Sequence, residues 1–529
     1  MGKIKVNLAM QKIKSFIKNS TTFIKNNKTE FLFLVGIILI GSFFRFYRIG
    51  EYMTFLGDEG RDALVVRRLL VNADIILVGP GTSIGNMYLG PLYYYFIAPA
   101  LLLFNFSPIG PSILVAFFGV LTIFLVWYAT RDMFGRVAAF AASILYAIAP
   151  TIIIYTKSSW NPNIMPFFAL LTVYGIWRFW QNREVFWLPI VGLSFAFVMQ
   201  SHYLGLLILP VVLIFWFLVF YKEIQNRKNS KEIFRILKFS LLGIFIFGFL
   251  MSPLVIFDAR HDWRNFSAIE KFFTDRQTTV SIKPWSGFAK VIPQLDKITS
   301  RLVSAKNEYV GGWLVVGYLA ALAWIFGLYR QKLTSKEKQA FIFLFIWLGI
   351  GVVGLSLYKQ EIYDHYYGFL APALFILLGG ILGHVKKVKL LGNIFLLTIL
   401  IFLIIVNLNE NPIKYSPNRQ LQRSADVANK IIEESNGQNF NFAVIAERNY
   451  EGAYQYFMEK NGSYLVQIDP QKADETIANQ LFVVCELDKS KCDPTHNSKA
   501  EVANFGWSKI ENEWDLYGVT IYKLVHSKK

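Results

Sequence analysis

The sequence predicts a polytopic α-helical membrane protein with a small α/β domain at its C-terminal end. Of its 529 residues, 54% are hydrophobic and only 17% are charged, and the mean hydropathy is +0.39. A soluble domain of this size carries a larger share of charge. The apolar residues gather in runs long enough for membrane helices, and the composition becomes polar from about residue 409. These three observations predict the fold class.

The net charge of +18 first suggests a nucleic-acid partner. The Lys and Arg residues, however, fall mainly in short segments between the apolar runs, where the positive-inside rule expects them. The predicted partners are therefore membrane lipids, and no nucleic acid is expected.

The first segment, residues 1–30, interleaves lysines with apolar residues and is typical of an amphipathic helix on the cytoplasmic membrane surface. It contains neither the apolar core nor the small-residue cleavage site of a signal peptide. The first span is therefore expected to remain as an anchor, with the N-terminus in the cytoplasm.

The domain of residues 31–408 is predicted to cross the membrane about eleven times. A twelfth apolar run, 89–104, is short, contains Pro99 and opens with three tyrosines, so a juxtamembrane or re-entrant helix is expected there. This choice places the basic loops in the cytoplasm, whereas twelve spans would place them outside. The expected spans are 31–47, 109–130, 136–155, 163–180, 185–200, 203–221, 236–257, 309–329, 338–357, 367–385 and 390–408.

With eleven spans, the polar segments that suggest chemistry all lie on the outer face. The first outer loop, 48–108, carries the carboxylate pair Asp58-Glu59 in the run Phe55-Leu-Gly-Asp-Glu-Gly-Arg-Asp62. The C-terminal domain, residues 409–529, follows the last span and is therefore also extracytoplasmic. The protein is predicted to be a multi-pass protein of the cytoplasmic membrane.

In this C-terminal domain, short segments rich in apolar residues predict strands at 439–446, 480–486 and 517–525. Helical spacing predicts helices at 424–435 and 452–460. The domain holds both cysteines, Cys485 and Cys492. Outside the cytoplasm they either pair across the short loop between them or remain two free thiols.

Three motifs together resemble a known superfamily. They are Asp58-Glu59, then Gly90-Pro91-Leu92-Tyr93-Tyr94-Tyr95, then Arg131-Asp-Met-Phe-Gly-Arg136 opening an Ala-rich span that ends in Ala149-Pro150. This order resembles the GT-C membrane glycosyltransferases, in particular protein O-mannosyltransferases and lipid A aminoarabinose transferases. The resemblance is specific over residues 45–165, rests on topology up to 408, and is absent from the tail. The family commonly has Pro-Pro where this chain has Leu89-Gly90-Pro91.

The resemblance implies an inverting transfer of a sugar from a polyprenyl-phosphate carrier to an acceptor hydroxyl of a protein, lipid or polysaccharide. A phosphate leaves as a stable anion without a general acid, so one carboxylate base suffices. Asp58 is the expected base, and Glu59 a supporting or acceptor-binding group. The structural alternative is that Asp58 is the N-cap of a helix with Glu59 in its first turn.

Outer-facing cations and aromatic residues are candidates for binding the donor's phosphate and sugar. Arg260 and His261 follow a span at the depth of a lipid phosphate. For each candidate the alternative is an interfacial anchor, a belt residue or a satisfied turn residue. The expected set is Arg260, His261, His202, Lys157, Trp160, Tyr93, His365 and Lys359.

No cofactor is expected, and no divalent metal, because the histidine spacing supports no metal cluster and Asp258-Ala-Arg-His-Asp262 is not an Asp-x-Asp motif. The rival class is a transporter or lipid-linked-sugar flippase. Carriers often show two related halves. None is visible between 31–221 and 236–408, and the acids and histidines gather at one face, which favours the enzyme.

Overall fold

The computed structural model describes residues 25–82, 87–225, 230–274, 284–328, 330–386 and 389–527. Most of the predicted amphipathic segment, residues 1–30, lies outside these residues.

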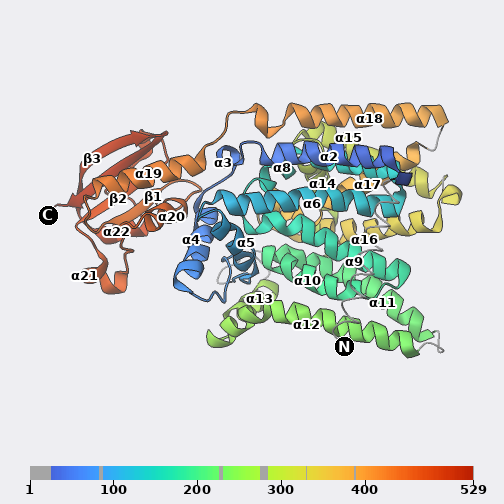
Figure 1. The fold of residues 1–529 in the computed structure, drawn as a ribbon, viewed down its shortest axis with the longest axis horizontal. Coiled ribbons are helices and arrows are strands. Elements are labelled where there is room, and N and C mark those ends of the chain that lie inside the picture. The colour runs from blue at the N-terminus through green and yellow to red at the C-terminus, as the bar shows by residue number, and fades with distance from the viewer. Residues whose placement is uncertain are drawn as a thin grey trace.

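Long helices run side by side along the molecule and form the membrane bundle (Figure 1). Every one of the predicted spans is helical, because each is an apolar run that satisfies its backbone groups internally. The helices are α2 Lys28–Phe46, α6 Ile109–Phe134, α7 Arg136–Ile148, α8 Pro150–Thr156, α9 Met165–Asn182, α10 Trp187–Ser201, α11 Leu209–Gln225, α12 Ser230–Arg260, α15 Glu308–Phe326, α16 Ser335–Leu357, α17 Ala371–Val385 and α18 Lys389–Asn409.

Among the described residues, seven helical segments are long and apolar enough to cross a membrane by length and composition, or eight if α7 and α8 form one span. These two helices meet at an angle of 60° where Pro150 interrupts the hydrogen-bond ladder. Helix α17 has 15 residues, about 22 Å, and is shorter than a bilayer core of about 30 Å. The total of about eleven crossings therefore stays a prediction.

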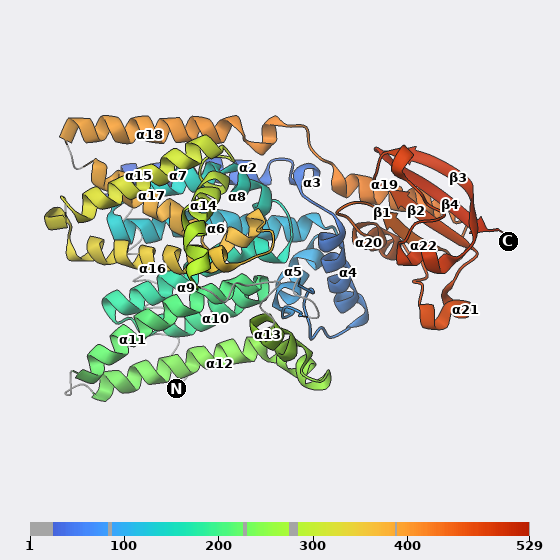
Figure 2. The same cartoon turned by 180° about the vertical axis from the view of Figure 1, so that it is seen from behind.

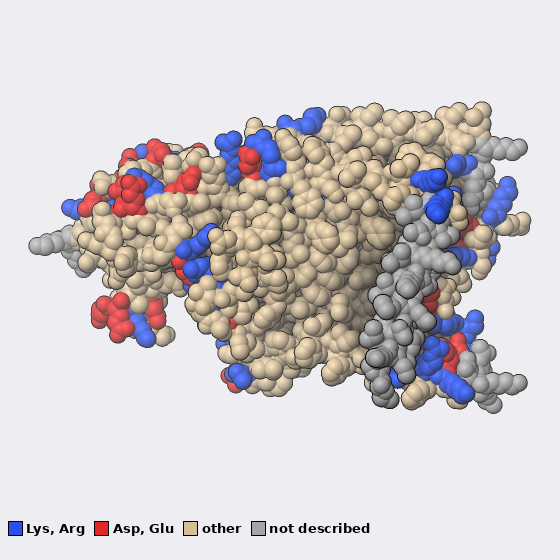
Figure 3. Space-filling model, viewed as in Figure 1, with Lys and Arg blue, Asp and Glu red and all other residues tan. Residues whose placement is uncertain are grey.

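The predicted cytoplasmic loops meet at one end of the bundle. There Glu30 at the start of α2 pairs with Arg131 at 2.5 Å and with Arg136 at 3.0 Å. Asp132 pairs with Lys336 at 2.6 Å. Ion pairs thus tie together segments that are distant in the sequence. On the face in Figure 3, charged residues lie on the C-terminal unit, at the end of the bundle next to it and at the far end of the bundle, and the tan surface between these two ends of the bundle shows none.

The opposite end of the bundle carries shorter helices (Figure 2). The run predicted as juxtamembrane forms α5, Leu92–Leu103, whose 12 residues are too short to span a membrane. Helix α4 contains the Asp58-Glu59 pair. Helix α4 spans Gly57–Asn72. The other helices at this end are α3 Ile49–Tyr52, α13 Arg264–Thr274 and α14 Pro284–Leu302. Short 3-10 turns join the helices: η1 Asn161–Ile164, η2 Tyr203–Ile208, η3 Arg330–Lys332, η4 Asp364–Phe369, η5 Pro412–Lys414, η6 Pro470–Lys472 and η7 Lys489–Lys491.

The C-terminal unit is a four-stranded sheet in the order β1-β2-β4-β3. Strands β1 and β2 are parallel, and β4 is antiparallel to both of its neighbours. The sequence did not predict β3, because its nine residues are largely exposed and polar. Cys485 and Cys492 form a disulfide, which settles the earlier alternative. The elements are α19 Gln420–Glu434, β1 Asn441–Ile445, α20 Gly452–Lys460, α21 Ala473–Thr476, β2 Gln480–Cys485, α22 Ala500–Phe505, β3 Ser508–Leu516 and β4 Val519–His526.

Helices α4 and α20 join the two parts through their backbones. A Cβ on Gly60 would lie 2.2 Å from the Ala453 nitrogen, and one on Gly452 would lie 2.3 Å from the Gly57 oxygen. Only glycine permits this approach. Farther along α4, Arg67 and Arg68 both pair with Glu459 of α20, at 2.9 and 2.7 Å. The C-terminal unit is therefore packed directly on the helix that carries the carboxylate pair.

The orientation in the membrane can be tested with single cysteines, since both native cysteines are paired. Trp507 in the C-terminal unit and Leu328 at the basic end are 63% and 87% exposed. A membrane-impermeant maleimide is expected to label Trp507→Cys in intact cells and Leu328→Cys only after permeabilisation, because basic loops stay inside. Labelling of Leu328→Cys alone in intact cells would reverse the orientation.

Candidate functional site

The first turn of α4 is capped from two sides. The Glu59 carboxylate accepts a hydrogen bond from the backbone N–H of Leu56, the N-cap residue, at 3.0 Å. The next N–H, of Gly57, donates to Oδ1 of Asn449 in the C-terminal unit at 2.8 Å. These bonds satisfy amides that a helix start leaves unpaired. Asp58 is therefore a first-turn residue and not the N-cap that the structural alternative assumed.

The two oxygens of Asp58 have different surroundings. Oδ1 accepts hydrogen bonds from the Tyr450 hydroxyl at 2.7 Å and from Nη1 of Arg61 at 2.8 Å. Oδ2 accepts none from the described residues. The side chain is 40% exposed and lines a cavity. One oxygen is thus held by the protein while the other is available to a bound molecule.

Arg61 lies between two carboxylates. Its Nη2 and Nε donate to Oδ1 of Asp62 at 2.7 and 3.1 Å, while Nη1 reaches Asp58. Burial raises the pKa of Asp62 to about 6, and the charge of Arg61 opposes this rise. Arg61 therefore holds Asp58 at a fixed place on the surface of α4.

The cavity beside Asp58 has a volume of about 230 Å³. Four of the predicted site residues, from four distant segments, lie on its wall: Asp58, Trp160, His202 and His365. The complete lining is Asp58, Arg61, Pro80, Gly81, Thr82, Leu89, Trp160, Asn161, Pro162, His202, Tyr203, Tyr363, His365 and Tyr366. Aromatic rings opposite a carboxylate suit the apolar face and the hydroxyls of a sugar.

The rings of this wall pack on one another. The His365 ring centre lies 4.4 Å from that of Trp160, and that of His202 lies 4.5 Å from that of Tyr366. Burial lowers the pKa of His202 to about 3 and that of His365 to about 4, although the charge of Asp58 raises the latter. Both imidazoles are therefore neutral at physiological pH. Nδ1 of His202 accepts from the Leu204 N–H at 3.2 Å, which leaves the proton on Nε2.

The loop between α8 and η1 is fixed by buried hydrogen bonds, so that Trp160 has a defined place. Ser158 accepts from the Thr54 N–H at 2.8 Å, and Asn161 donates to the Ser201 carbonyl at 2.7 Å. Tyr93 contacts the Ser159 hydroxyl at 2.8 Å. Lys157 donates to the Tyr47 carbonyl at 3.1 Å, and burial lowers its pKa to about 8. Tyr93 and Lys157 lie behind the cavity wall and support it.

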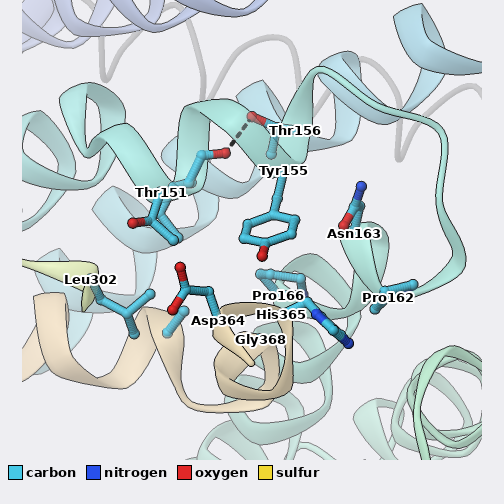
Figure 4. A pocket seen from close by; sticks show the side chains of 12 residues that line it. Thr151, Tyr155, Thr156, Pro162, Asn163, Pro166, Leu302, Asp364, His365 and Gly368 are labelled. Atoms are coloured by element: carbon cyan, nitrogen blue, oxygen red, sulfur yellow. Dashed lines mark hydrogen bonds between the residues drawn. The ribbon is translucent and has the colours of Figure 1, made fainter. Parts of the chain in front are cut away.

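A second, smaller pocket of about 30 Å³ adjoins the cavity through His365 and Pro162 (Figure 4). Tyr155 points from α8 toward Asp364 and His365. Asp364 is paired with Arg301 at 3.2 Å. These contacts fix the start of η4, and therefore the place of His365 on the cavity wall.

The remaining predicted site residues lie away from the cavity. Glu59 is buried and faces Met53, Phe55 and Ile97 on the opposite side of α4. Arg260, His261 and Lys359 are exposed, and the structure does not place them on the cavity wall. The positions of these residues in the sequence did not show which of their side chains would face the cavity.

Two residues at Asp58 were not predicted. Arg61 follows Asp58 by three residues, and this helical spacing is a signal for contact. Tyr450 carried no such signal, because it belongs to a different domain and its place depends on how α20 packs on α4. In the described part of the chain, no three His, Cys, Asp or Glu side chains gather as a metal site.

Glu59→Gln distinguishes a capping role from a chemical one. Burial raises the pKa of Glu59 from 4.5 to about 7, so the folded protein keeps a proton that the unfolded chain loses between these pH values. Stability therefore falls as pH rises through this window. Gln keeps the cap without the charge and is expected to add up to about 3 kcal/mol at pH 8, with transfer activity retained. Thermal unfolding at pH 5 and pH 8 measures the change, and loss of activity in a stable variant would assign Glu59 a chemical role.

The sequence and the fold were compared with known proteins. Residues 89–256 match the family model for dolichyl-phosphate-mannose-protein mannosyltransferase. No curated protein matches the sequence.

Two kinds of solved structure are similar in fold. ArnT from Cupriavidus metallidurans bound to undecaprenyl phosphate has 14% identity and a TM-score of 0.56, over 94% of this chain and 98% of that chain. The same protein in the apo state has 12% identity and a TM-score of 0.57, over 93% and 97%. The archaeal oligosaccharyltransferase AglB from Archaeoglobus fulgidus, in complex with an inhibitory peptide and a dolichol-phosphate, has 15% identity and a TM-score of 0.53, over 88% and 70%. The chain therefore has the GT-C fold over nearly its whole length and resembles the mannosyltransferase family in sequence over residues 89–256.

Proposed function

We propose that this protein is an inverting membrane glycosyltransferase. It moves a sugar from a polyprenyl-phosphate carrier to a hydroxyl of a protein, lipid or glycan acceptor on the outer face of the cytoplasmic membrane. The observation that carries the proposal is Asp58, which lines a cavity walled by aromatic rings and whose Oδ2 accepts no hydrogen bond from the described residues. The family match and the fold of a protein that binds undecaprenyl phosphate support the choice of donor.

In the proposed reaction, Asp58 acts as the general base. The acceptor hydroxyl gives its proton to Oδ2 as its oxygen attacks the anomeric carbon of the sugar. The bond from that carbon to the phosphate oxygen breaks, and the electron pair leaves with the polyprenyl phosphate. Attack from the face opposite the phosphate inverts the anomeric configuration. The leaving phosphate is already a stable anion, so the site needs no proton donor for it.

The other residues of the cavity wall bind the donor. Trp160, His365 and Tyr366 offer ring faces to the sugar, and the neutral His202 offers an N–H to a hydroxyl. Arg61, the arginine on the wall, supplies positive charge near the departing phosphate. The exposed Arg260, His261 and Lys359 are assigned to the lipid headgroups and the carrier phosphate outside the cavity.

The proposal also assigns the two ends of the bundle. The end with the basic loops and the N-terminus faces the cytoplasm. The cavity and the C-terminal unit face outward, where a lipid-linked sugar meets its acceptor. The carrier's lipid chain would lie along the apolar surface of the bundle.

Asp58→Asn tests the base directly. The amide keeps the shape of the side chain but takes no proton, so kcat is expected to fall by about a hundredfold to ten-thousandfold. The assay follows sugar release from a panel of polyprenyl-phosphate sugars by purified protein in nanodiscs. Asp74→Asn, an exposed acid just after α4, is the matched control and should retain full activity.

Two results would contradict the proposal. One is transfer by Asp58→Asn at the rate of the wild type. The other is a product that keeps the anomeric configuration of the donor, which NMR of the product reveals.

A further inference from the structure

We propose that the C-terminal unit completes the transferase site. Tyr450 and Asn449, with Glu486 behind them, are positioning residues that hold Asp58 so that its Oδ2 faces the cavity. This inference rests on the proposed function, because it assigns these residues to the base of that reaction. It adds that the membrane domain alone does not contain the whole site.

Tyr450 contacts Asp58 directly. Its hydroxyl donates to Oδ1 at 2.7 Å, on the same oxygen that Arg61 holds. Burial raises the pKa of Tyr450 well above its usual range, so the hydroxyl keeps its proton and remains a donor. The ring also packs on the backbone of α4, since a Cβ on Gly57 would lie 2.4 Å from it. Tyr450 therefore limits both the rotation of the carboxylate and the position of the first turn of α4.

Asn449 fixes the start of the same helix. Its Oδ1 accepts from the Gly57 N–H at 2.8 Å, and its Nδ2 donates to Oε1 of Glu486 at 2.7 Å. The two partners require opposite ends of the amide, so they define its orientation. Asp58 is the next residue after Gly57, and any shift of this cap moves the base.

Glu486 ends this series of contacts and holds the amide of Asn449 in place. Its Oε1 also accepts from the Tyr454 hydroxyl at 2.5 Å and from Nη2 of Arg423 at 3.4 Å. The residue follows directly on Cys485, whose disulfide to Cys492 closes the loop that Glu486 begins. The loop is thus anchored both by a covalent bond and by the end of β2.

The packing of α20 on α4 gives these residues one arrangement. The glycine contacts at Gly60 and Gly452 leave no space for the helices to slide, and the pairing of Arg67 and Arg68 with Glu459 sets their register. In the segment that leads into α4, the Phe55 N–H donates to Oε1 of Gln420 in α19 at 3.1 Å. Contacts on both sides of Asp58 therefore come from the C-terminal unit.

Among the described residues, the charged and titratable groups that interact electrostatically with Asp58 are Arg61, Asp62, Glu59, His365 and Tyr450. The first four belong to the membrane domain and remain in place when Tyr450 is replaced. Removing the hydroxyl of Tyr450 takes away one donor that stabilises the charged carboxylate.

Tyr450→Phe is the test. It keeps the ring on Gly57 and removes the two hydrogen bonds of the hydroxyl, the one it donates to Oδ1 of Asp58 at 2.7 Å and the one it accepts from Nη1 of Arg61 at 3.1 Å. We expect kcat to fall by about tenfold to a hundredfold, as for loss of a bond to a charged group, with KM for the donor within about twofold. The acidic limb of the pH–rate profile should move to higher pH. Tyr464→Phe, at a tyrosine of the same unit that is 57% exposed, is the control and should change neither value.

Three further variants test the contacts behind Tyr450. Asn449→Ala removes the cap and the bond to Glu486, so kcat should fall while the KM for the donor stays near that of the wild type. Glu486→Gln keeps an acceptor oxygen for Asn449 and should retain most of the activity, whereas Glu486→Ala should behave as Asn449→Ala does. A merely structural role would instead change KM and thermal stability equally in all of them.

The outcomes separate this inference from the proposed function. If Asp58→Asn is inactive but Tyr450→Phe matches Tyr464→Phe in kcat and in pH profile, the positioning role is overturned and the base remains. If Asp58→Asn is active, the proposed function itself fails. Loss of kcat in Tyr450→Phe with the expected shift in pH profile supports both.

Discussion

The architecture depends on the backbone contact between α4 and α20. Glycines at 57, 60 and 452 let the two helices touch without side chains between them, and a Cβ at Gly60 or Gly452 would collide with backbone atoms at 2.2 to 2.3 Å. Around this contact, one apolar cluster joins Phe55 and Leu64 of the membrane part to residues of the C-terminal sheet. The outer loop with the carboxylates is therefore held between two domains and is not a free membrane loop.

This contact explains how a polar site can be ordered at a membrane surface. The bundle supplies the ring walls, since His202 and His365 come from turns that join membrane helices. The C-terminal unit supplies the Tyr450 hydroxyl, one of the two donors that hold Oδ1 of Asp58, and Arg61 of α4 supplies the other. The cavity itself is lined by residues of the membrane domain, and the buried hydrogen bond from Asn161 to the Ser201 carbonyl fixes part of its wall. In the proposed function, a lipid-linked donor enters along the bundle and meets its acceptor at the free oxygen of Asp58.

The sequence alone predicted the helices and strands that depend on a local pattern of apolar residues. Apolar runs predicted the helices of the bundle, and the strands β1, β2 and β4 were also predicted. Helix α14 was missed within the segment 258–309, and β3 was missed because its exposed residues carry no hydrophobic pattern. For the candidate site, Asp58 was selected from its carboxylate pair and the family resemblance, and Trp160, His202 and His365 from their places in segments expected to face outward. The structure places all four on the wall of one cavity. Glu59 points to the opposite side of its own helix, and Tyr450 arrives from another domain. Neither the direction of a side chain nor interdomain packing can be read from spacing in one sequence.

The most direct test of the account is a cryo-EM structure of the Asp58→Asn protein with a polyprenyl-phosphate sugar bound. The account predicts the sugar within the cavity between residue 58 and the rings of Trp160, His202 and His365, with the phosphate beside Arg61. It also predicts an opening next to the carboxamide of residue 58 that is large enough to admit the acceptor. A sugar bound elsewhere, for example at Arg260 and His261 on the end of α12, would contradict the assignment of Asp58 as the base.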